Sequence, residues 1–105
     1  MAKATINSGN CGFRTEVEAT MNGAMCNLII KSECTAIQRL AENLDPVNPY
    51  KEISFRRTTP TIHEKGAQFC SHASCPVPVG IIKAVEVEAG LALPTNVTIE
   101  LTNEK

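Results

Sequence analysis

The sequence has no tryptophan, few aromatic residues and no block of like charges. Aromatic residues make up 4% of the 105 residues, so an interior must be built from isoleucine, valine, leucine and alanine. Apolar residues reach 43% and charged residues 20%, which is typical of a globular chain and too hydrophobic for disorder. The formal net charge is −1, without the basic patch of a nucleic-acid binder, so no nucleic-acid partner is expected.

Long apolar segments are also missing. No stretch approaches the roughly 20 apolar residues that a membrane-spanning helix needs. Residues Met1 to Gly9 lack the apolar core of a signal peptide. We therefore expect no membrane partner and a cytoplasmic location. The length predicts a single domain over residues 1–105, while the partner is not indicated and a homodimer stays open.

Signatures of the common enzyme classes are absent as well. The chain has no glycine-rich phosphate loop, no Gly-x-Ser-x-Gly, no His-Glu-x-x-His and no dinucleotide fingerprint. It also lacks the paired Cys-x-x-Cys motifs of a zinc ribbon. Whether the protein is an enzyme is left open, and any chemistry has to come from its five cysteines and two histidines.

A β-hairpin is the clearest local feature. Residues Phe13 to Thr20 alternate between apolar and polar side chains, which predicts a half-buried strand. Asn22-Gly23 then gives a two-residue turn signal, and Ala24 to Ser32 predicts the returning strand. If these two turn residues form the loop, opposed residue numbers sum to 45.

This register brings two cysteines together. Val17 faces Leu28, so that one apolar face forms, and further along Cys11 faces Cys34. Directly opposed side chains have Cβ atoms about 4.5 to 5.5 Å apart. The register therefore predicts that the two thiols meet at the open end of the hairpin.

The rest of the chain predicts helices on one side of this sheet. Apolar stripes indicate one principal helix from Thr35 to Leu44 and another from Pro76 to about Ala89. A closing strand is expected over Val97 to Leu101, with a short strand at Lys51 to Arg57 and a short helix at Thr61 to Phe69. The resulting fold class is α+β, in two layers, with a mainly antiparallel sheet and two principal helices packed on one face.

Four side chains are candidate metal ligands: Cys11, Cys34, His72 and Cys75. Cytosolic thiols are normally reduced, so a cysteine group there more often indicates metal binding or catalysis than disulfides. Zinc accepts mixtures of cysteine and histidine, and iron–sulfur clusters accept thiolates. The leading hypothesis is a small metal-binding protein with zinc or an iron–sulfur cluster as its cofactor.

Two other functions stay open. Cys75, as the expected N-cap of the second principal helix, could be the nucleophile of a thiol redox or sulfur-handling protein, because a helix N-terminus favours a thiolate. Cys34 or Cys11 would then be the resolving thiol. Alternatively, the protein is a non-catalytic interaction module whose cysteines pack as small apolar side chains, as expected for Cys26 and Cys70 in either case.

Two resemblances bear on these hypotheses. Around Ser74, Cys75 and Pro76 the chain resembles the TSCPD domain, and this resemblance implies metal binding through cysteines, with Cys34 before a helix as the earlier one. Almost the whole chain resembles an uncharacterised family of small proteins from anaerobic bacteria and archaea. The matching stretches are Cys11-Gly12-Phe13, Ser32-Glu33-Cys34, His72 to Pro78 and Glu86 to Pro94. That resemblance implies an anaerobic setting, in which an exposed thiol or iron–sulfur site would survive.

Overall fold

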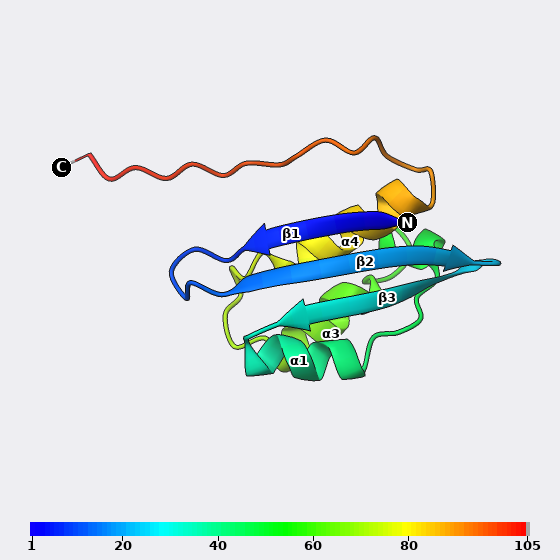
Figure 1. Cartoon of the computed structure of the whole chain (residues 1–105), viewed down its shortest axis with the longest axis horizontal. Helices are drawn as coiled ribbons and strands as arrows, with labels where there is room; N and C mark the ends of the chain where they lie inside the picture. The colour runs from blue at the N-terminus through cyan, green and yellow to red at the C-terminus, as the bar shows by residue number, and fades with distance from the viewer. Residues whose placement is uncertain (105) are drawn as a thin grey trace.

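A three-stranded antiparallel sheet forms one layer of the protein (Figure 1). The computed structural model describes residues 1–104. The strands are β1 (Ala2–Asn7), β2 (Arg14–Asn22) and β3 (Met25–Ser32), in the order β1-β2-β3. The sheet is therefore a meander in which β2 is the central strand.

Helices cover one face of this sheet and form the second layer. They are α1 (Thr35–Glu42), α2 (Pro49–Glu52), α3 (Thr61–Phe69) and α4 (Val77–Glu88). Helix α4 packs on β1 and β2, α1 packs on β3, and α3 contacts both α1 and α4 (Figure 1). The predicted α+β class, the two principal helices and the short helix at Thr61–Phe69 are confirmed. Among residues 1–104, no helix has the length and apolar character needed to cross a membrane.

The core lies between these two layers and follows the alternation of the strands. Val17 and Ala19 on β2 and Leu28 on β3 are buried, whereas Glu16 points to solvent from the other face. Ile81 on α4 is fully buried against them. The predicted core faces of the hairpin and of α4 are correct.

The predicted register of the hairpin is wrong by two residues. Val17 pairs with Ile30 and Ala19 with Leu28, so that opposed residues sum to 47 instead of 45. The loop consists of Gly23 and Ala24, with Gly23 at φ +64°. Within residues 1–104 only glycines have a positive φ. In this turn, therefore, Gly23 takes the left-handed conformation and Ala24 does not. Because the side-chain period of a strand is two, this shift leaves every side chain on its predicted face.

The register change removes the reason for placing Cys11 beside Cys34. The β2–β3 ladder ends at the pair Thr15 and Ser32, where the two hydroxyls are hydrogen-bonded at 2.9 Å. Cys11 lies before β2, in the exposed turn between β1 and β2. Cys34 lies two residues after the end of β3, as the N-cap residue of α1.

Three other segments differ from the sequence predictions. The expected strand at Lys51–Arg57 is wrong: its first residues end helix α2, which starts with Pro49 behind the cap Asn48, and the exposed Phe55 lies in irregular chain. The closing strand at Val97–Leu101 is wrong too, since this segment is extended but joins no sheet (Figure 1). Strand β1 was not predicted, because its alanines and polar residues carry little strand propensity.

A buried carboxylate fixes the start of α3. Glu52 is only 2% exposed and its Oε1 accepts a hydrogen bond of 2.7 Å from the backbone N–H of Ile62, while the N-cap Pro60 offers no side-chain acceptor.

We predict that Glu52→Ala lowers the free energy of unfolding by about 1–3 kcal/mol, because it leaves the buried backbone N–H of Ile62 without a hydrogen-bond acceptor. Glu52→Gln, which keeps an acceptor, should cost less. Urea unfolding followed by circular dichroism measures both, and equal losses would contradict this role.

Candidate functional site

Three cysteines lie at the ends of three helices. Cys34 is the N-cap residue of α1, and Cys70 is the C-cap residue of α3, with its N–H donating to the carbonyl of Gly66 at 2.8 Å. Cys75 directly precedes Pro76, the N-cap of α4. The expected N-cap position of Cys75 is thus off by one residue.

Helix packing brings these three ends together. Helix α3 lies against α1 on one side and α4 on the other, so its C-terminal end faces the starts of both neighbours. The thiols of Cys34, Cys70 and Cys75 are all half-buried against the hydrophobic core. We call these three residues the cysteine cluster.

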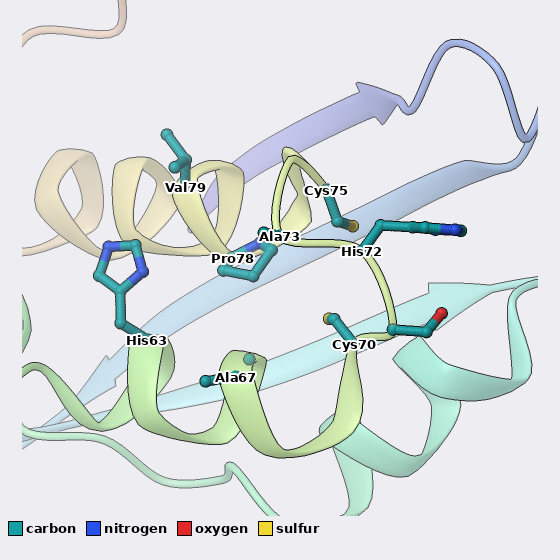
Figure 2. Close-up of a pocket in the computed structure, with 10 residues that line it drawn as sticks. His63, Ala67, Cys70, His72, Ala73, Cys75, Pro78 and Val79 are labelled. Carbon is teal, nitrogen blue, oxygen red and sulfur yellow. The ribbon is translucent and has the colours of Figure 1, made fainter.

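A glycine allows the close approach of α3 and α4 below this cluster. A Cβ atom at Gly66 would lie 2.9 Å from Cγ of Pro78, which is closer than real Cβ contacts permit. Any larger residue at position 66 would therefore push the two helices apart. Figure 2 shows the result: the sulfur atoms of Cys70 and Cys75 point into the same space between the end of α3 and the start of α4.

The space in front of the two sulfurs is a groove of about 460 Å³. One face of α3 forms a wall, with His63, Gly66, Ala67 and Cys70 at helical spacing. The residues before α4 and its first turn form the opposite wall (Figure 2). The imidazole of His63 stacks on the ring of Phe55, with centroids 5.1 Å apart, and this contact fixes the far end of the groove.

The surroundings of Cys70 disfavour its thiolate. Burial above all, then the like charge of the neighbouring Cys75 and of Cys34, together raise the pKa of the Cys70 thiol to about 11. Burial likewise raises the pKa of Cys26, which is fully enclosed in the core. At neutral pH Cys70 is therefore a protonated thiol next to another thiol.

The predicted ligands fall into two groups. Cys34 and Cys75 both belong to the cysteine cluster, where each interacts with Cys70. Cys11 lies in the exposed β1–β2 turn, and the exposed His72 points its ring away from the two sulfurs (Figure 2). No group of three or more His, Cys, Asp or Glu side chains within residues 1–104 is arranged to hold a metal ion.

Cys70 is the residue that sequence reasoning missed. It was expected to be a packing residue like Cys26, which is indeed fully buried. One signal was available in the sequence: Cys70 follows His63 by seven residues, so that both lie on one face of the short helix that Thr61–Phe69 predicts. The loop of four residues between Cys70 and Cys75 also permits the two to meet.

Comparison with known proteins gives a family but no relative of known role. Searches of curated proteins and of solved structures return no significant match. A family model does match residues 2–101, which include the sheet, all four helices and the cysteine cluster. The chain therefore belongs to a family of unknown function (DUF6951).

Proposed function

We propose that the protein is a thiol redox or sulfur-handling protein whose working pair is Cys75 and Cys70. The observation that carries this proposal is the juxtaposition of the two thiols at the groove, where the charge of one affects the other. Cys75 is the attacking residue and Cys70 the resolving residue. Cys70 replaces Cys34 and Cys11 as resolving thiol, since it lies beside Cys75 across a short loop.

The reaction is an exchange with a small or protein-borne disulfide that enters the groove. The Cys75 thiolate attacks one sulfur of the substrate, forming a mixed disulfide and releasing the other half as a thiolate. The sulfur of Cys70 then attacks Cys75, breaks the mixed disulfide and releases the second half. The protein dithiol is oxidised to one internal disulfide, and the substrate disulfide is reduced to two thiols, which take up the two protons.

The electrostatics of the pair favour this order of events. Before the reaction, burial and the nearby charge of Cys75 hold the pKa of Cys70 at about 11, so Cys70 is a poor first nucleophile. Once Cys75 is in a mixed disulfide it has no charge, and this contribution to the raised pKa of Cys70 is lost. Burial, the largest cause, still raises the pKa of Cys70 at that stage, so the resolving attack relies mainly on the closeness of the two sulfurs.

Binding of a soft metal ion is a second candidate function. It is favoured by the third thiol, Cys34, which is close enough to Cys70 to affect its ionisation. Zinc or an iron–sulfur cluster would use Cys34, Cys70 and Cys75 as ligands. The three side chains are not arranged to hold a metal ion in this structure, so metal binding would require the three sulfurs to move closer together.

The setting proposed for this chemistry is the cytoplasm of an anaerobe. A reducing compartment keeps the pair as a dithiol until a substrate disulfide or a sulfur donor arrives. The half-exposed Cys75 would also escape the oxidation to sulfenic and sulfinic acids that oxygen drives.

Alkylation of the anaerobically purified protein tests the proposed pair. Peptide mass spectrometry should show slow labelling of Cys70 near pH 7 and a rise as the pH approaches 11, because only the thiolate reacts and burial raises the pKa of Cys70. Cys11, which is exposed, is the internal reference, and Cys26 should react only after unfolding. Labelling of Cys70 at neutral pH as fast as Cys11 would contradict the assignment.

Elemental analysis of the same preparation separates the two candidate functions. The dithiol function predicts a metal content far below one ion per chain and labelling that a chelator does not change. Stoichiometric zinc or iron, with protection of Cys34, Cys70 and Cys75 that a chelator removes, would favour the metal site instead.

A further inference from the structure

The C-terminal segment after α4 has the sequence of a strand but has no strand beside it. From Asn96 to Leu101 apolar and polar residues alternate, and the backbone is extended. The apolar members Val97, Ile99 and Leu101 are 62%, 77% and 88% exposed. We call residues 96–101 the tail strand. Such a row of exposed aliphatic side chains indicates an interaction surface, because a monomer gains nothing from it.

The two edges of the sheet differ: the β3 edge is partly occupied, whereas the outer edge of β1 is open. On β3, Cys26 exchanges two backbone hydrogen bonds with Val47, of 2.7 and 3.0 Å, and the N–H of Leu28 donates to Asp45 at 2.7 Å. On the opposite side the sheet ends at β1, and no backbone segment in the described part of the chain pairs with its outer edge. An uncovered edge of this kind is a template for strand addition.

The side chains of β1 and the tail strand match when the two are laid antiparallel. Placing Ile99 opposite Ala4 pairs all six residues of β1 with the tail strand and puts the apolar side chains of both on the helix-covered face. The resulting pairs are Ala2 with Leu101, Lys3 with Glu100, Ala4 with Ile99, Thr5 with Thr98, Ile6 with Val97 and Asn7 with Asn96. Small alanines thus meet large aliphatic residues, and opposite charges face each other on the polar side.

The direction of the chain points to a second copy as the source of this strand. Figure 1 shows the tail strand running in the same direction as β1 of its own chain and apart from it. Pairing within one chain would therefore be parallel, in a sheet that is otherwise antiparallel. A two-fold axis perpendicular to the strands reverses the direction of the partner's tail, which then meets β1 antiparallel, the slightly more stable arrangement.

We infer that two copies of this chain form a dimer by exchanging tail strands, each adding residues 96–101 to the β1 edge of the other. The exchange buries three exposed aliphatic side chains per chain and satisfies the open edge of both sheets. It also places Lys3 between Glu18 of its own β2, at 3.8 Å, and Glu100 of the added strand.

Sedimentation equilibrium of matched variants tests the exchange. The parent protein should be a dimer at micromolar concentration, and Ile99→Asp should weaken dimerisation by at least about 100-fold, because it places a charge on the buried face of the added strand. Thr98→Asp, one residue away on the polar face, is the matched control and should remain dimeric. Circular dichroism of each variant checks that the domain is folded.

Charge exchange between copies distinguishes two chains from one. Lys3→Glu and Glu100→Lys each place like charges opposite one another in both halves of a homodimer, and each should weaken it several-fold to tenfold. An equimolar mixture of the two variants restores opposite charges at both contacts between positions 3 and 100, so the heterodimer should form more tightly than either variant's homodimer. Pairing within one chain gives no rescue on mixing.

Three results would overturn the inference. They are a parent protein that stays monomeric at about 100 µM, a dimer that Ile99→Asp leaves intact, and variants at positions 3 and 100 that gain nothing on mixing. None of these results bears on the cysteine pair, whose alkylation is measured separately.

Discussion

Replacement of Cys70 by serine is expected to trap a mixed disulfide on Cys75. In the parent protein, we expect glutathione disulfide to form an adduct at Cys75 that Cys70, at the adjacent helix end, then removes. Without Cys70 this intramolecular step is lost, so the adduct should persist and its decay slow by roughly 100-fold or more. Mass spectrometry of the intact protein, followed over time after acid quenching, measures the adduct.

The experiment is done in a protein that lacks two other thiols, and it includes the reciprocal variant in which Cys75 is replaced instead of Cys70. Cys11→Ser removes the exposed thiol, and Cys34→Ser removes the third thiol of the cluster, which could otherwise resolve the adduct in place of Cys70. In this background Cys75→Ser should form almost no adduct, because Cys70 is half-buried and this burial raises the pKa of its thiol. If Cys75→Ser forms an adduct as fast as Cys70→Ser, the two roles are interchanged or do not exist.

The largest loss of stability is expected from Ile81→Ala. Ile81 is fully buried where α4 packs between the sheet and α3. Removing its outer carbons leaves a cavity that rigid neighbours cannot fill, so the free energy of unfolding should fall by about 2–5 kcal/mol. A domain of this size has only about 5–15 kcal/mol in total, so the variant should unfold at a much lower urea concentration.

Glu16→Ala is the matched control for the packing argument. Glu16 is exposed on the uncovered face of the sheet, and its loss should change the free energy of unfolding by no more than about 0.5 kcal/mol. A parental urea midpoint for Ile81→Ala would mean that α4 does not pack as described. A large loss for Glu16→Ala would mean that the covered face of the sheet is assigned incorrectly.

The helices and strands with a clear apolar periodicity were predicted from the sequence, whereas those that depend on tertiary contacts were missed. The hairpin and the helices α1, α3 and α4 follow from alternation, helical stripes and flanking prolines. The turn register could not be fixed, because Asn22-Gly23 and Gly23-Ala24 both supply a glycine for a two-residue loop. Strand β1 has too little strand propensity to be recognised alone and forms because β2 and α4 cover it.

The candidate site was predicted in part for a related reason. Cys34 and Cys75 were identified from their places before helices, and both belong to the cysteine cluster. Cys11 was included through a register that is wrong by two residues, which changes cross-strand partners but not faces. Cys70 was missed because its place depends on the packing of α3 between α1 and α4, which no local pattern encodes.

Disulfide mapping in glutathione buffers of graded potential tests the central claim most directly. After equilibration without oxygen, free thiols are alkylated, the protein is digested, and each cysteine peptide is quantified. The dithiol function predicts that Cys70 and Cys75 lose their labels together and form one linking disulfide. This transition should follow the two-electron slope of about 30 mV per tenfold change in the ratio of disulfide to dithiol. Independent glutathionylation of the two cysteines, or labels retained on both at every potential, would contradict it.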